Sequence, residues 1–148
     1  MIRPVRRASG LLAVLATLVL SPSPARALDI RNDPGGPVEA RIAQLQALRD
    51  KGTPVRIVGT CLSACTLLLG LAETCVMPDA RLGFHGPSTR LKGIPLPREE
   101  FERVSRLMAE HYPEPLRRWF LAEARMRTDG YITLRGWQAI AMGARACD

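Results

Sequence analysis

Apolar residues along the chain fall either in short runs or in stripes at helical spacing, and the two patterns alternate. The first half predicts a strand, a helix, a second strand and a buried helix at 28–32, 38–48, 54–58 and 63–71. A turn rich in Pro and Gly at 33–36 separates the first strand from the first helix, and Gly59 closes the second strand.

The second half begins with two short strands and continues with helices. The predicted elements are strands at 74–77 and 81–84, an exposed loop at 86–97, and helices at 98–111, 115–126 and 133–142. Strands that alternate with helices predict an α/β fold with a mostly parallel sheet and flanking helices. Sites in such sheets lie where strands run into helix N-termini, and the chain offers two such junctions, at 33–38 and 59–65.

The opening segment has the three parts of a secretory signal peptide. A basic start precedes an apolar run at 11–20, and a Pro/Ser stretch ends in Ala25-Arg26-Ala27. The apolar run is shorter than the roughly 20 residues of a membrane span. We therefore predict a signal peptide at 1–27, a single domain at 28–148, and a periplasmic or secreted protein with no stable membrane span.

The signal segment changes the meaning of the net charge. Removing its 27 residues and their four arginines from the total of 148 residues and +7 leaves 121 residues with a charge of +3. The remaining basic residues are interleaved with acids, as in 98–103, and aromatic residues make up only 5% of the chain. This pattern argues against a nucleic-acid partner, and the length suffices for one core.

Four cysteines in an exported chain predict disulfides, of which three connectivities exist and the sequence alone chooses none. The cysteines are Cys61, Cys65, Cys75 and Cys147. A zinc site is not expected, because Cys61-x3-Cys65 has no second close pair and the only histidines are His85 and His111. A thiol redox pair normally has two intervening residues rather than three, which argues against a redox protein. A free Cys61–Cys65 thiol pair is kept as the redox alternative.

Ser63 and His85 are the residues with the clearest chemical potential. Ser63 lies in the first turn of a buried helix, where free backbone N–H groups and the helix dipole stabilise an oxyanion. The alternative is that Ser63 is only a helix cap. His85 follows a short strand and precedes Gly86-Pro87, so it can act as general base if it comes within hydrogen-bond reach of the serine. The alternative is a structural histidine.

Several motifs together resemble the proteolytic subunit of the Clp protease, in the Clp/crotonase superfamily, and in particular its exported relatives with a Cys-x-Ser-Ala-Cys core. The motifs are Asp33-Pro34-Gly35-Gly36-Pro37-Val38, Gly59-x3-Ser63-Ala64, Pro78-Asp79-Ala80-Arg81 and Gly83-Phe84-His85-Gly86-Pro87. The resemblance covers most of 28–148 and implies a Clp/crotonase-like fold. The family usually has a strand and a helix before the first strand found here, so the fold is expected to be N-terminally abbreviated.

The resemblance implies roles for individual residues. Ser63 corresponds to the nucleophile and His85 to its base. Asp129 corresponds to the acid that orients the histidine, and Thr133 would then cap the last helix. An ordinary Asp-Gly turn is the alternative reading of Asp129.

Backbone groups are implied as the oxyanion hole. The donors would be the N–H of Ala64 and that of a glycine in the turn formed by Gly35 and Gly36. Cys61 and Cys65 flank the serine and are expected to fix the turn, paired with each other or with the other two cysteines. A bridge from Cys75 to Cys147 would tie the C-terminus to the core.

The implied activity is that of an exported serine hydrolase, in particular a peptidase, with a peptide or protein substrate. No metal ion is expected, because the cysteines and histidines lack the spacing of a metal site. No cofactor is expected either, because the coenzyme A used by the crotonase branch is cytosolic and the serine does not fit that branch. The alternative is a non-catalytic peptide-binding or assembly module of the same fold. The rings of the Clp subunit also raise a homo-oligomer as an option.

Overall fold

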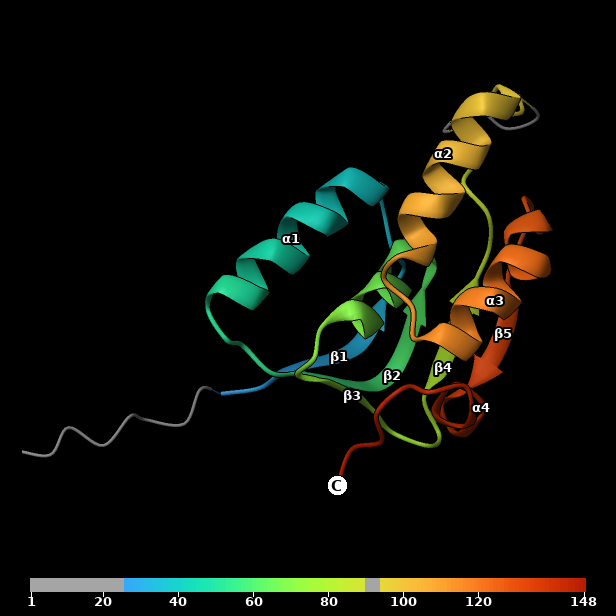
Figure 1. Ribbon diagram of the computed structural model, residues 1–148. Helices are drawn as coiled ribbons and strands as arrows, with labels where there is room; N and C mark the ends of the chain where they lie inside the picture. Colours follow the sequence, from blue (N-terminus) through green and yellow to red (C-terminus); the bar gives the residue numbers. More distant parts are fainter. Residues whose placement is uncertain (1–25, 90–93) are drawn as a thin grey trace, which may run out of the picture.

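The computed structural model describes residues 26–89 and 94–148, which form a mixed α/β fold around a five-stranded sheet (Figure 1). The α/β prediction is thereby confirmed. Residues 1–25 of the expected signal peptide and 90–93 of the expected loop lie outside the described residues. In chain order the elements are β1 Leu28–Asp33, α1 Val38–Asp50, β2 Val55–Leu62, the 3₁₀ helix η1 Ser63–Gly70, β3 Thr74–Val76, β4 Arg81–Phe84, α2 Arg98–Ala109, α3 Glu114–Ala122, the 3₁₀ turn η2 Ala124–Met126, β5 Ile132–Arg135 and α4 Gly136–Ala141.

The sheet is parallel except at one edge. Its order is β1-β2-β4-β5, and β3 pairs with the first half of β2. β1, β3 and β4 run parallel to β2, whereas β5 is antiparallel to β4. α1 begins where β1 ends, beside the C-terminal half of α2 (Figure 1). The carboxyl ends of β1, β2 and β4 therefore meet near two helices, the usual place of a site in such a sheet.

β2 is longer than its apolar run predicts. It continues through Gly59 to Leu62, although a glycine at this position was expected to end it. A side chain at Gly59 would collide with the carbonyl oxygen of Arg31 in β1, at a register shift between the two strands. The glycine therefore permits a close approach of two strands, and the extension carries the chain to Ser63.

The C-terminal segment differs most from its prediction. Residues 132–135 form strand β5, and helix α4 begins only at Gly136, so the expected helix at 133–142 is wrong in its first three residues. Thr133 is not a helix cap but pairs with Gly83 of β4. Sheet pairing overrides the helical pattern here, because β5 completes the hydrogen bonding of an otherwise unpaired β4 edge.

The core lies where the sheet meets η1, α2 and α3. Its largest fully buried side chains include Phe84 of β4 and Phe120 of α3, and Phe84 packs edge-on against Trp119 at 5.4 Å between ring centroids. The chain end is attached to this core by a disulfide between Cys75 and Cys147. This bridge lies beside backbone pairing of the C-terminal tail with β3.

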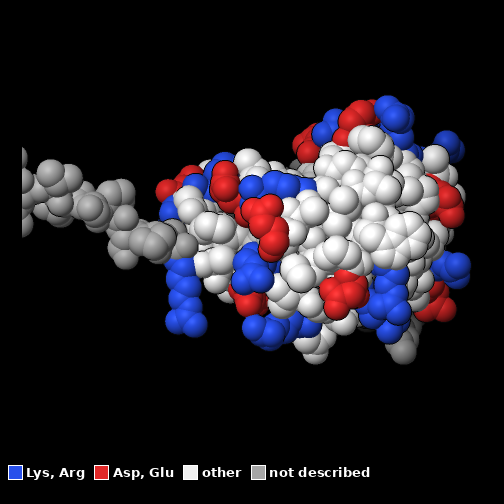
Figure 2. All heavy atoms as spheres, turned by 90° about the horizontal axis from the view of Figure 1, so that it is seen from below, with Lys and Arg blue, Asp and Glu red and all other residues white. Residues whose placement is uncertain are grey.

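The visible surface carries charges of both signs. In Figure 2 basic and acidic side chains are interspersed around a broad uncharged area. Within residues 26–89 and 94–148, no helix combines the length and the apolar character that crossing a membrane requires.

Candidate active site

The turn from β2 into η1 holds Ser63 in an uncommon conformation. Its φ is +56°, and among the described residues it is the one non-glycine residue with positive φ. This left-handed conformation costs an L-residue about 1–2 kcal/mol, so the surrounding structure must impose it. A serine presented on a sharp strand-to-helix turn is a known geometry for an exposed nucleophile.

The register of β2 and β4 brings His85 to this serine. Leu62 pairs with Gly83, so Ser63 and His85 emerge from neighbouring parallel strands at the same edge of the sheet. The distance from Ser63 Oγ to His85 Nε2 is 2.6 Å. The structure thus brings together the predicted nucleophile and the predicted base.

The other ring nitrogen of His85 sets the proton arrangement. Nδ1 lies 2.6 Å from the carbonyl oxygen of Gly86, and a carbonyl only accepts, so Nδ1–H donates. In the neutral ring Nε2 then carries the lone pair and accepts the hydroxyl proton of Ser63. Gly86 itself donates its N–H to Arg127 at 2.8 Å, and a side chain at Gly86 would collide with the carbonyl oxygen of Arg125. The histidine is therefore oriented by a backbone carbonyl that is itself held in place.

Burial of the His85 ring lowers its pKa, and the hydrogen bond to the Gly86 carbonyl opposes this shift in part. The ring packs edge-on against Tyr131 at 5.3 Å between centroids. A lowered pKa keeps His85 neutral, and hence able to accept a proton, at pH values where a free imidazole is half protonated.

Asp129, the predicted orienting acid, is not brought to His85. It is exposed, and in the described part of the chain no hydrogen bond or ion pair joins it to the ring. The carbonyl of Gly86 accepts the hydrogen bond from His85 Nδ1 instead. The difference arises because the segment before β5 follows the β4–β5 pairing rather than a helix cap at Thr133.

The predicted oxyanion-hole residues lie together, with one change. The N–H of Gly35 already donates to Asp33 Oδ1 at 2.8 Å, so it is not available to a ligand. Gly36 lines the same cleft as Ser63, and its N–H donates to no acceptor among the described residues. Ala64 is the second residue of η1, where N–H groups have no acceptor within the helix. Gly36 and Ala64 are the remaining candidate donors.

Two buried hydroxyl groups, those of Thr66 and Tyr112, also hold the backbone of Ser63. The sequence did not predict this pair. Thr66 donates to the Ser63 carbonyl at 2.8 Å, and its hydroxyl accepts from Tyr112 OH at 2.8 Å. Burial raises the pKa of Tyr112, so its hydroxyl stays protonated and able to donate. The one sequence signal for this role was a tyrosine at the end of an amphipathic helix, which does not indicate its partner.

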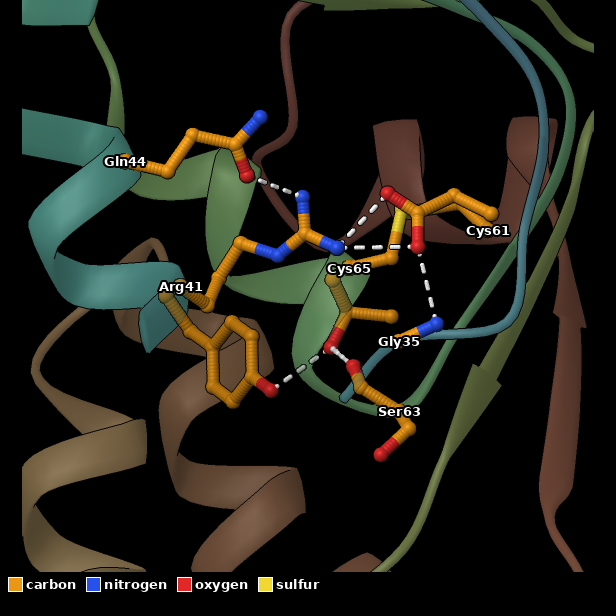
Figure 3. Close-up of a disulfide and its surroundings, with 9 residues drawn as sticks. Gly35, Arg41, Gln44, Cys61, Ser63 and Cys65 are labelled. Carbon is orange, nitrogen blue, oxygen red and sulfur yellow. Dashed lines mark hydrogen bonds and ion pairs between the residues drawn. A yellow bond between two sulfur atoms is a disulfide. The ribbon is translucent and has the colours of Figure 1, made fainter. Parts of the chain in front are cut away.

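All four cysteines are paired, Cys61 with Cys65 and Cys75 with Cys147. The first bridge joins the end of β2 to η1 and so spans Ser63 (Figure 3). Cys61 and Cys65 are both fully buried. A buried bridge is poorly accessible to an attacking thiolate, which favours a structural role over thiol exchange.

Ser63 and His85 open into a cleft of about 440 Å³. Its sides come from the turn before α1, the segment after β4, and α2. The lining residues are Gly36, Pro37, Val38, Glu39, Ser63, His85, Gly86, Pro87, Ser88, Thr89, Leu96, Glu100, Val104 and Met108. This volume is in the range of small-molecule and side-chain pockets.

A scan against protein-family models and a search of curated proteins found no match to the chain.

Proposed function

We propose that the protein is a serine hydrolase, with Ser63 as nucleophile and His85 as general base. The observation that carries the proposal is the 2.6 Å contact from Ser63 Oγ to His85 Nε2, made by a serine held at φ +56° in an open cleft. A helix-capping serine needs neither the left-handed conformation nor a histidine partner.

The geometry supports acyl transfer in two stages. Ser63 Oγ attacks the substrate carbonyl carbon while its proton passes to His85 Nε2, and the negative charge that develops on the carbonyl oxygen faces the N–H groups of Ala64 and Gly36. His85 then gives this proton to the leaving group, and the C–N or C–O bond breaks. Water then attacks the acyl carbon and gives a proton to His85. The bond from the acyl carbon to Ser63 Oγ breaks, and His85 returns the proton to Oγ.

The carbonyl of Gly86 takes the part that a carboxylate has in the Ser-His-Asp triad. It fixes the tautomer of His85 through the 2.6 Å contact with Nδ1. A neutral carbonyl stabilises the imidazolium less than a carboxylate does, so we expect a slower enzyme than one with a full triad.

We extend the proposal to fold family, substrate and location. The order of strand, glycine turn, Gly-x3-Ser and strand-end His supports a Clp/crotonase-like fold and hence a peptide or protein substrate. Two disulfides fit an oxidising compartment, which supports export to the periplasm or beyond the cell.

A fluorophosphonate probe tests the proposal, because it phosphonylates only an activated serine. The oxidised protein, produced from residue 28, should be labelled at Ser63, as located by peptide mass spectrometry. Ser63→Ala should not be labelled, and His85→Ala should be labelled at least about 10²-fold more slowly.

A second serine that lines the cleft provides the control. Ser88→Ala removes a second hydroxyl that lines the cleft but does not contact His85, and it should be labelled as the parent is. Labelling that survives in Ser63→Ala contradicts the assignment of the nucleophile. Peptide binding without labelling in the parent would favour a non-catalytic binding module.

A further inference from the structure

Arg41 is a buried arginine on a helix whose one other buried residue is apolar. It is 8% exposed and lies on α1, one turn before the buried Leu45. A guanidinium at this depth is costly unless it is paired and hydrogen-bonded. Nη2 contacts both carboxylate oxygens of Asp33 at 2.8 and 2.7 Å, and Nη1 donates to Gln44 at 2.6 Å.

The partner of Arg41 is the residue that shapes the glycine turn. Asp33 ends β1, and its Oδ1 also accepts the N–H of Gly35 at 2.8 Å. Gly35 and the next residue, Gly36, both have positive φ, at +97° and +137°. The turn therefore has little conformational preference of its own and takes its position from Asp33.

This turn is packed directly against the nucleophile. A Cβ on Gly35 would lie 2.6 Å from Ser63 Cβ and 3.1 Å from the backbone nitrogen of Ala64. Asp33 is also the register partner of Cys61, one of the two cysteines that span Ser63. A shift of the Asp33 carboxylate thus moves the turn relative to the N–H of Ala64.

We propose that Arg41 is a positioning residue for the oxyanion hole, acting through Asp33 on the Gly35–Gly36 turn. Neither charged residue lines the cleft, so neither touches the substrate. The inference rests on the proposed function, because it assigns the Gly36 N–H as the second oxyanion donor. Arg41 holds this donor opposite that of Ala64.

A purely structural ion pair is the competing explanation, and an ion pair away from the turn provides the control for it. Arg56 of β2, which is more exposed than Arg41, pairs with Asp29 of β1 at 3.5 Å, at the ends of these strands that lie away from the turn. Arg56→Met removes an arginine that pairs with β1 without touching the turn. Arg41→Met removes the positioning contact.

The test compares the rate of fluorophosphonate labelling at several probe concentrations. Arg41→Met should lower the limiting rate about 10- to 100-fold, as a displacement of about 1 Å does, and leave the half-saturating probe concentration within about twofold. Arg41→Lys keeps the charge but loses the contact with Gln44, and it should fall between. Arg56→Met should match the parent.

Arg41→Met leaves a buried carboxylate unpaired and can lose stability for that reason. The double variant Asp33→Asn/Arg41→Met removes both charges and keeps an oxygen for the Gly35 N–H. It should fold and still show the lowered limiting rate. Parent-like labelling of this folded variant overturns the inference.

An amide spectrum separates the failure of this inference from that of the proposed function. If the parent is not labelled at all, the hydrolase proposal fails, and the ¹H–¹⁵N resonances of Gly35 and Gly36 still report the turn. They should shift in folded Asp33→Asn/Arg41→Met and stay in place in Arg56→Met. Unshifted resonances in the double variant overturn the positioning role.

Discussion

We expect the Cys75–Cys147 disulfide to contribute more to the stability of the protein, and the Cys61–Cys65 disulfide to contribute more to the reactivity of Ser63. Cys61–Cys65 closes a loop with a sequence separation of 4 and spans Ser63, whereas Cys75–Cys147 closes one of 72 and lies at β3, beside the first half of β2. In the chain-entropy model the short loop contributes about 2 kcal/mol to the free energy of unfolding and the long loop about 4 kcal/mol. The perturbation is the replacement of both cysteines of one bridge by alanine.

Reactivity depends on what each bridge holds. Ser63 has φ +56°, which costs about 1–2 kcal/mol, and the short bridge ties the residues two positions before and after it. Without the bridge Ser63 can relax, and a shift of about 1.4 kcal/mol reduces the competent population about tenfold. Cys61→Ala/Cys65→Ala should therefore be labelled by fluorophosphonate about tenfold more slowly.

Two measurements on the two double-alanine variants separate the effect of each disulfide on stability from its effect on the reactivity of Ser63. Urea unfolding followed by circular dichroism gives the loss of stability, and the labelling rate is taken at low temperature, where both variants are folded. Cys75→Ala/Cys147→Ala should be the less stable variant and should be labelled at the rate of the parent. Equal slowing of both variants, after correction for the folded fraction, would refute a specific role of the short bridge.

Three further outcomes are expected. Because burial lowers the pKa of His85 below its ordinary 6.5, the labelling rate should rise with pH and reach half its maximum below pH 6.5, and a midpoint above that value contradicts the assigned base. Gly35→Ala places a Cβ 2.6 Å from that of Ser63 and should abolish labelling, whereas Gly52→Ala, also at positive φ but in open space, should lose only stability. Asp129→Asn should leave the rate within about twofold, because the exposed carboxylate does not contact His85; a loss near the 10⁴-fold of a true triad acid would restore its predicted role.

Local patterns in the sequence were enough to indicate most elements and to single out Ser63 and His85. Alternation and helical spacing indicated β1, α1, β4 and α2 within a few residues, because each element buries one face and its period is visible. Ser63 was recognised because it lies in the first turn of a predicted buried helix, and His85 because it follows a short strand and precedes Gly86-Pro87. That they come within 2.6 Å depends on the pairing of Leu62 with Gly83, which no local pattern specifies.

The remaining features required contacts between segments distant in sequence. Hydrophobic patterning determined that an α/β core forms, since burial of apolar faces depends mainly on composition and period. Tertiary structure alone decided that Thr133 joins a strand, that the Gly86 carbonyl rather than Asp129 contacts His85 Nδ1, and that Arg41 is buried. Each of these features depends on which hydrogen bonds form in the folded chain. The partner of a buried polar group is set by which segments the fold brings together.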